Sequence, residues 1–98
     1  MKLKSLKPIS EKEFQSQVVQ LAKLRGWKVY HTFDSRRSTP GFLDLVLVRE
    51  RVLFVECKTD TGQLTDEQFE WLRALDKAGQ KTLIWRPMYW PCIENELE

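Results

Sequence analysis

The sequence predicts a single α/β domain in which one helix, three strands, a second helix and a fourth strand follow in that order. Ninety-eight residues suffice for one hydrophobic core and are too few for two. Two segments show helical apolar periodicity behind a capping signal, and the segments between and after them are rich in β-branched and aromatic residues. The 42% hydrophobic and 31% charged composition is typical of a folded globular protein and excludes a disordered one.

The first helix is predicted to begin after Ser10, because Ser10 and Glu13 have the spacing of a capping box. An apolar stripe with helical spacing follows, and Gly26 is a typical residue to end the helix. Residues 28–33, KVYHTF, predict the first strand, and residues 34–41 predict a polar loop rich in turn formers. The stripe consists of Phe14, Val18, Leu21 and Ala22.

Residues 41–58, GFLDLVLVRERVLFVECK, predict two strands joined by a turn centred on Glu50. With this turn the residue numbers of each cross-strand pair add up to 100, as they do for Val48 and Val52. Side chains with even numbers then share one face of the hairpin, and we expect that face to be the buried one. A register shift of one residue would turn opposing side chains to opposite faces.

Three charged residues lie on this otherwise apolar face. Asp44 is opposite Glu56, and Lys58 lies roughly 6–7 Å beyond Glu56 along the same strand. Two carboxylates directly opposite each other destabilise a sheet, which makes sense here if a cation lies between them. Oxygen ligands at close range suit Mg²⁺ or Mn²⁺. The alternative is that these charges only mark the positions where the strands leave the core.

The second helix is predicted to begin after Thr65, whose capping-box partner is Gln68. Gly79 ends this helix, and residues 81–85, KTLIW, predict the last strand. The buried stripe of the helix is expected to consist of Phe69, Leu72 and Leu75, widened by Trp71 and Ala78.

The whole chain, residues 1–98, is interpreted as one domain with a basic leader at residues 1–9 and an irregular tail at residues 88–98. No apolar run approaches the roughly 20 residues that span a bilayer, and no apolar segment follows the leader as in a signal peptide. We therefore expect a cytoplasmic protein without a membrane partner.

Charge is distributed unevenly along the chain. Residues 1–40 contain nine basic and three acidic residues, whereas residues 41–98 contain seven basic and eleven acidic ones. A basic first half favours a polyanionic partner, although only weakly. With His31 the only histidine, the cysteines Cys57 and Cys92 do not complete a zinc site, and both are expected to be free thiols.

A carboxylate at the start of one strand, followed by E-x-K at the end of the next, resembles the motif of the PD-(D/E)xK nuclease superfamily. The motif consists here of Asp44, Glu56 and Lys58, with Cys57 as the variable residue. Within that superfamily the segments SEKEFQSQVVQLAKLRGWKVYHT, DSRRSTPGFLDLVLV, VLFVECK, GQLTDEQFEWL and AGQKTLIWRP are similar to the VRR-NUC (virus-type replication-repair nuclease) family. Leu43 is a departure, because the family usually has proline before the aspartate.

The resemblance implies a restriction-endonuclease-like αβββαβ fold and a Mg²⁺- or Mn²⁺-dependent nuclease. It implies that Asp44, Glu56 and the backbone carbonyl of Cys57 hold the metal, and that Lys58 orients or deprotonates the attacking water or stabilises the transition state. A third carboxylate commonly comes from the first helix in this superfamily. Glu11 lies on the same helical face as the apolar stripe, whereas Glu13 is explained by the capping box, so Glu11 is favoured.

Four further residues are candidates for contacts with the site or the substrate. Arg36 and Arg37, in the loop ahead of Asp44, are expected to bind DNA phosphates, or else they are only solvated. His31 is an accessory candidate, although a lone strand histidine more often has a packing role. Gln68 matches a position that the family favours, and its capping-box role also explains it without catalysis.

The small stand-alone members of the family resemble homodimeric Holliday-junction resolvases. A four-way junction needs two cuts, and a two-fold symmetric dimer presents two copies of one site. We therefore expect a homodimeric endonuclease acting on branched or four-way DNA. A flap-type or less selective DNA nuclease is the alternative among enzymes, and a noncatalytic DNA-binding module of the same fold is the alternative outside them.

Overall fold

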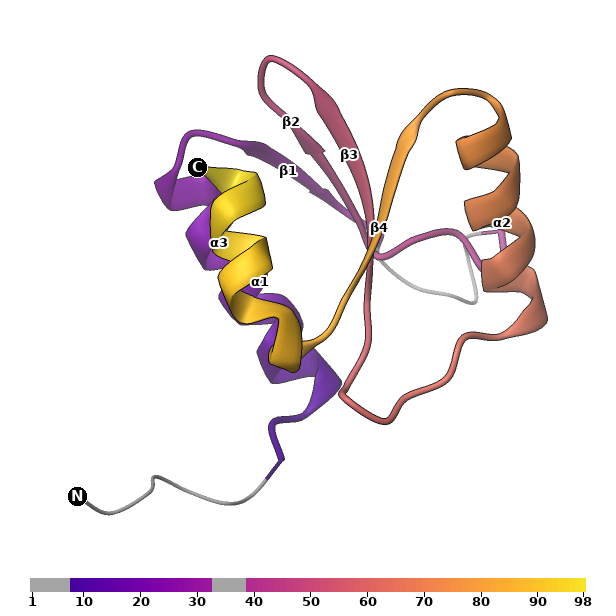
Figure 1. Ribbon diagram of the computed structural model, residues 1–98, viewed down its shortest axis with the longest axis horizontal. Helices are drawn as coiled ribbons and strands as arrows, with labels where there is room; N and C mark the ends of the chain where they lie inside the picture. Colours follow the sequence, from indigo (N-terminus) through magenta and orange to yellow (C-terminus); the bar gives the residue numbers. More distant parts are fainter. Residues whose placement is uncertain (1–7, 33–38) are drawn as a thin grey trace.

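The computed structural model describes residues 8–32 and 39–98. A four-stranded mixed sheet in the order β1-β2-β3-β4 has α1 and α3 on one side and α2 on the other (Figure 1). Only β3 and β4 are parallel. Within the described residues, no helix has the length and apolar character needed to cross a membrane. The elements are α1 (Glu11–Leu24), β1 (Lys28–His31), β2 (Leu45–Val48), β3 (Val52–Cys57), α2 (Asp66–Lys77), β4 (Lys81–Trp85), the 3₁₀ helix η1 (Pro87–Tyr89) and α3 (Trp90–Leu97).

Both predicted helix starts are confirmed, and each has a complete capping box. The Ser10 hydroxyl accepts the N–H of Glu13 at 3.1 Å, and the Glu13 carboxylate accepts the N–H of Ser10 at 3.1 Å. Thr65 and Gln68 make the same reciprocal pair at the start of α2. Each box satisfies two backbone N–H groups that the helix itself leaves unpaired.

The register of the hairpin is as predicted, whereas the expectation about its buried face is wrong. Val48 pairs with Val52 and Val46 with Phe54. The even-numbered face is nevertheless only partly covered, and Val48 is 38% exposed. The odd-numbered side chains are the buried ones because α1 packs on their side of the sheet, whereas α2 packs along β4. These fully buried residues are Leu45, Leu47, Leu53, Val55 and Cys57.

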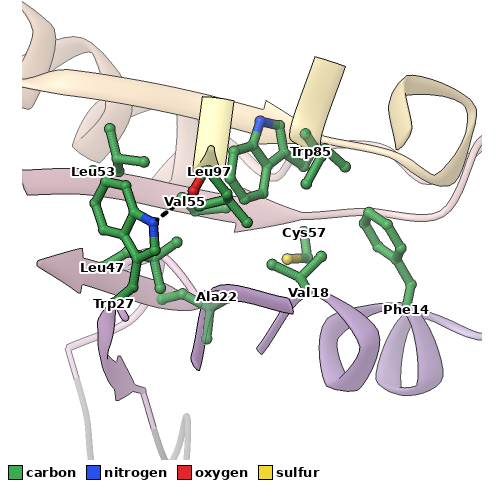
Figure 2. Close-up of a cluster of buried hydrophobic side chains, with 12 residues drawn as sticks. Phe14, Val18, Ala22, Trp27, Leu47, Leu53, Val55, Cys57, Trp85 and Leu97 are labelled. Carbon is green, nitrogen blue, oxygen red and sulfur yellow. Dashed lines mark hydrogen bonds between the residues drawn. The ribbon is translucent and has the colours of Figure 1, made fainter. Parts of the chain in front are cut away.

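The hydrophobic core therefore lies between the odd-numbered face and the two helices α1 and α3. Figure 2 shows the side chains of α1 facing those of β2 and β3, with the ring N–H of Trp27 bonded to Leu97 of α3. Phe69, expected in the buried stripe of α2, is instead 51% exposed, and Leu72 is the buried residue of that helix. The core residues contributed by α1 are Phe14, Val18 and Ala22.

The tail, predicted to be irregular, folds as η1 and α3. Pro91 lies in the first turn of α3, where a missing N–H costs nothing, so this proline starts the helix instead of breaking it. Ile93 and Leu97, four residues apart, are fully buried in the core. Trp90 packs edge-on against Phe14 with ring centroids 6.4 Å apart. Eight residues are too few for a stable isolated helix, and α3 owes its stability to these contacts.

Side chains of four residues between Arg25 and Arg51 bind the last carbonyl groups of α3. Positive donors suit this end of a helix, because its carbonyl groups lack intrahelical partners and carry the negative end of the dipole. The guanidinium groups of Arg49 and Arg51 also lie over the Trp27 ring, at 4.6 and 5.0 Å from its centroid. The bonds run from Arg25 to Glu94 O (2.6 Å), Arg51 to Glu96 O (2.5 Å), Trp27 to Leu97 O (3.0 Å) and Arg49 to Glu98 O (2.9 Å).

If α3 is an integral part of the core, Ile93→Ala lowers the free energy of unfolding by about 2–5 kcal/mol, the usual cost of truncating a buried aliphatic side chain. Urea unfolding followed by circular dichroism measures this loss. The control is Met88→Ala, because Met88 is 57% exposed and its truncation should change stability by no more than about 0.5 kcal/mol. Equal small effects of both substitutions would contradict the packing of α3.

Candidate functional site

The structure brings Asp44, Glu56 and Lys58 together where β3 ends. The N–H of Cys57 donates a hydrogen bond to Asp44 Oδ2 at 2.9 Å. The Lys58 ammonium lies 3.5 Å from Glu56 Oε2. Glu56 is only 1% exposed, and Lys58 is also buried. Two carboxyl groups and one ammonium group thus share a confined site.

Asp44 is held by the end of β1. The Thr32 N–H donates to the Asp44 carbonyl oxygen at 2.9 Å, and the Thr32 hydroxyl donates to the Leu43 carbonyl oxygen at 2.6 Å. The Leu43 side chain is fully buried, so the position just before Asp44 is anchored in the interior even though it is not proline. These bonds continue the pairing of β1 with β2 past Leu45 and leave the carboxyl group of Asp44 free to reach β3.

The turn before Asp44 packs against the first turn of α2. Gly41 has a φ of +85°, and a Cβ atom at this position would lie 2.5 Å from Cβ of Glu67 and 2.8 Å from its carbonyl oxygen. Both the conformation and the close approach require glycine. The next residue, Phe42, packs edge-on against Trp71 of α2 at 5.1 Å between ring centroids. The chain leading to Asp44 is therefore fixed on α2.

Gln68 both caps α2 and contacts the site, whereas the sequence left these two roles as alternatives. Its side-chain oxygen accepts the Thr65 N–H at 2.9 Å and completes the capping box of α2. Its Nε2 donates to Glu56 Oε2, also at 2.9 Å. The side chain that caps α2 consequently also orients the carboxyl group of Glu56.

Burial makes ionisation of both carboxyl groups unfavourable. Burial, and then the neighbouring charge of Asp44, raise the pKa of Glu56 to about 8. Burial likewise raises the pKa of Asp44, against the opposing effects of the Cys57 N–H, Lys58 and His31. The direction is the same for both groups, because the surrounding donors replace only part of the hydration that burial removes.

The carboxyl oxygens fit a divalent cation. Glu56 Oε1 is buried and has no hydrogen-bond partner among the residues that the structure describes. An unsatisfied buried acceptor beside a second carboxylate suits a hard ion that prefers oxygen ligands, such as Mg²⁺ or Mn²⁺. Asp44 and Glu56 would hold the ion, and the carbonyl group of Cys57 as a further ligand stays a prediction.

Glu11 is not brought into this pair. Within residues 8–32 and 39–98, no three side chains of His, Cys, Asp or Glu come together in a way that could hold a metal ion. Glu11 is exposed at the start of α1. It lies near enough to Cys57 for its charge to add to the effects of burial, Asp44 and Glu56 that raise the pKa of that thiol. Its role as a third ligand stays a prediction.

Of the other residues predicted to contact the site or the substrate, the structure describes His31 but not Arg36 or Arg37. His31 ends β1 and is exposed, and its charge acts on the pKa of Asp44. Arg36 and Arg37 lie outside the described residues. Both cysteines are free, as expected, with Cys57 buried and Cys92 exposed.

Sequence reasoning gave no role to Thr32, Gly41 or Arg86, which hold the chain around the site. Their contacts join segments from 11 to 27 residues apart, including the bonds from Thr32 to Leu43 and from Arg86 to Thr59. Gly41 carried the one available signal, since a glycine shortly ahead of a buried strand, here four residues before Leu45, often marks a turn with positive φ.

In the metal-free protein, we predict that the free energy of unfolding falls as the pH rises from about 5 to 8. Glu56 has a pKa of about 8 in the folded protein, against an ordinary value of 4.5, so the folded state holds a proton that the unfolded state has lost. This stabilising contribution is complete below the unfolded pKa and is lost as the pH rises through the folded pKa.

Urea unfolding in chelator at several pH values measures this slope. Glu56→Gln, which keeps the shape of the side chain and removes its proton equilibrium, should flatten it, and Mg²⁺ should reduce it in the wild-type protein by favouring the ionised carboxylate. The same slope in wild type and variant would contradict the assignment to Glu56.

Comparisons with known proteins agree with this fold. A solved structure described as a VRR_NUC domain protein matches with a TM-score of 0.70 at 23% identity, over 82% of this chain and 79% of that one. Hjc of Archaeoglobus fulgidus, a Holliday junction resolvase from an archaeal hyperthermophile, matches with a TM-score of 0.51 at 20% identity, over 74% of this chain and 64% of that one. No curated protein matches. The VRR-NUC domain model matches residues 6–86, and the chain therefore belongs to the VRR-NUC family.

Proposed function

We propose that this protein is a divalent-metal-dependent DNA endonuclease that resolves four-way junctions as a homodimer. One observation carries the proposal: the buried Glu56, with an oxygen that has no partner in the described part of the chain, lies beside Asp44 and Lys58. Membership of a nuclease family supports the class of reaction.

Hydrolysis of a phosphodiester requires an activated water and positive charge near the phosphoryl oxygens. A bound Mg²⁺ or Mn²⁺ would supply Lewis acidity to the attacking water and to the phosphoryl oxygens. Asp44 and Glu56 would hold the ion, and the Cys57 N–H and the Gln68 amide keep their carboxyl groups in place. The Lys58 ammonium, 3.5 Å from Glu56 Oε2, either orients the attacking water or stabilises the developing negative charge.

DNA as the substrate is supported by charge and by position. The first forty residues are strongly basic, and Arg36 and Arg37 precede the site closely enough in sequence to bind phosphates beside the scissile bond. His31 lies at the end of β1, and its charge lowers the pKa of Asp44. It is therefore an accessory candidate for contact with the DNA strand that is cut.

Junction preference rests on symmetry together with the likeness in fold to Hjc. Paired cuts on a four-way junction require two active sites related by a two-fold axis, which a homodimer supplies without any further component. A flap-type or less selective nuclease uses the same chemistry without this requirement.

Cleavage assays with a labelled four-way junction and a linear duplex of the same arms test the activity. We expect paired cuts in the junction with Mg²⁺ or Mn²⁺, no cutting in chelator, and much slower cutting of the duplex. Equal rates on both substrates would favour the less selective nuclease. No cutting with either metal would favour a noncatalytic DNA-binding module.

Asp44→Ala and Lys58→Ala should each lower the cleavage rate by at least about a hundredfold while junction binding survives, because each removes charge stabilisation from the transition state. Lys77→Ala, at the exposed end of α2, is the control for loss of a lysine. Glu11→Gln and Glu13→Gln decide the third carboxylate: we expect Glu11→Gln to lower the rate, and Glu13→Gln to affect only the capping box. A fully active Asp44 or Lys58 variant would remove that residue from the mechanism.

We predict a dimer in solution at micromolar concentration. Analytical ultracentrifugation of the metal-free protein should give twice the 11.7 kDa mass of the chain. A monomer that cuts the junction at only one strand per encounter would contradict the resolvase assignment and leave the nuclease assignment intact.

A further inference from the structure

Arg86 fastens the turn that directly follows Lys58. Its Nη1 atom donates to the Thr59 carbonyl oxygen at 2.6 Å and to the Gly62 carbonyl oxygen at 2.8 Å. The Gly62 N–H donates to the same Thr59 carbonyl at 3.2 Å, which closes the turn. One guanidinium nitrogen thus holds both ends of residues 59–62, called here the post-lysine turn.

The segment that carries Arg86 is joined to the post-lysine turn at two further points. The parallel pairing of β3 with β4 ends with Cys57 opposite Trp85, and the Lys58 N–H then donates to the Trp85 carbonyl oxygen at 2.9 Å. Beyond Arg86, the Met88 N–H donates to Asp60 Oδ1 at 2.9 Å. Arg86 lies between these two bonds, so its own position is well defined.

The post-lysine turn forms a wall beside the aliphatic part of Lys58. A Cβ atom at Gly62 would lie 3.6 Å from Cδ of Lys58 and 3.0 Å from the Thr59 hydroxyl, so the backbone of the turn is close to the lysine side chain. Lysine has four rotatable bonds and a large side-chain entropy, and a fixed wall reduces the conformations available to it. The turn therefore helps to determine the position of the Lys58 ammonium group relative to Glu56.

We propose that Arg86 is a positioning residue for the reaction. It keeps the post-lysine turn against the side chain of Lys58, and the ammonium group of Lys58 consequently stays beside the carboxyl group of Glu56. Arg86 acts through the turn, because its side-chain hydrogen bonds go to the carbonyl groups of Thr59 and Gly62 and not to the two carboxylates. The inference rests on the proposed nuclease function, since Lys58 needs a fixed position only if it takes part in catalysis.

The test compares Arg86→Ala and Arg86→Lys with wild type in single-turnover cleavage of the preferred DNA substrate. We expect the maximal rate of Arg86→Ala to fall by about 10²-fold, the loss that a small misplacement of a catalytic group causes. The affinity for DNA, measured in Ca²⁺, and the salt dependence of that affinity should stay unchanged. Arg86→Lys should restore little, because the lysine side chain ends one atom closer to the backbone than Nη1 of arginine, and its ammonium group would not reach both carbonyl oxygens. Arg73→Ala, an exposed arginine of α2, is the matched control and should keep the wild-type maximal rate.

A measurement without DNA or metal provides an independent readout. Amide hydrogen exchange of Gly62 should be about tenfold faster in both Arg86 variants than in wild type and unchanged in Arg73→Ala, because the turn loses bonds that resist local opening. Unchanged exchange would overturn the inference.

A wild-type maximal rate in Arg86→Ala would also overturn it. A loss confined to DNA affinity and its salt dependence would overturn it in favour of a direct phosphate contact by Arg86. Failure of the wild-type protein to cut any DNA would instead overturn the proposed function itself.

Discussion

The site depends on the burial of the Glu56 carboxyl group beside that of Asp44. Removal of carboxylates from water is unfavourable unless donors and opposite charges replace the lost hydration. Lys58, the Gln68 amide and the Cys57 N–H supply part of that replacement. Burial still raises the pKa of both carboxyl groups, so the metal-free domain keeps its two acids close at a cost to its own stability. Such an arrangement is better explained by a cation than by the stability of the free chain.

The rest of the fold offsets this cost on the opposite face of the same strands. In β3 the residues Leu53, Val55 and Cys57 point to α1 and α3, whereas Glu56, between the last two of them, points to α2. The two-residue period of a strand thus separates the side chains that hold the domain together from those of the proposed site. The helix α3 belongs to the first group, since Ile93 and Leu97 are buried in the core.

The sequence was informative where the decisive interactions are local. Both capping boxes join residues three apart, and the short turn fixes the hairpin register. The buried face was predicted wrongly because both faces of β2 are apolar, with Val46 on one and Leu47 on the other, and only the packing of α1 and α3 decides between them. The helix α3 was missed for the same reason, since its stability comes from partners such as Phe14, more than seventy residues earlier. The role of Arg86 likewise becomes visible only when the parallel pairing places it beside the turn after Lys58.

The helix α2 contributes no carboxylate to the pair, yet it links the two segments that do. Gln68 holds the carboxyl group of Glu56, and its neighbour Glu67 meets the backbone of Gly41, three residues before Asp44. Both residues belong to the first turn of α2, whose conformation is fixed by the cap at Thr65. A displacement of this turn would move the two carboxyl-bearing segments relative to each other. The capping box that marks a helix start in the sequence therefore also helps to set the separation of the two carboxylates.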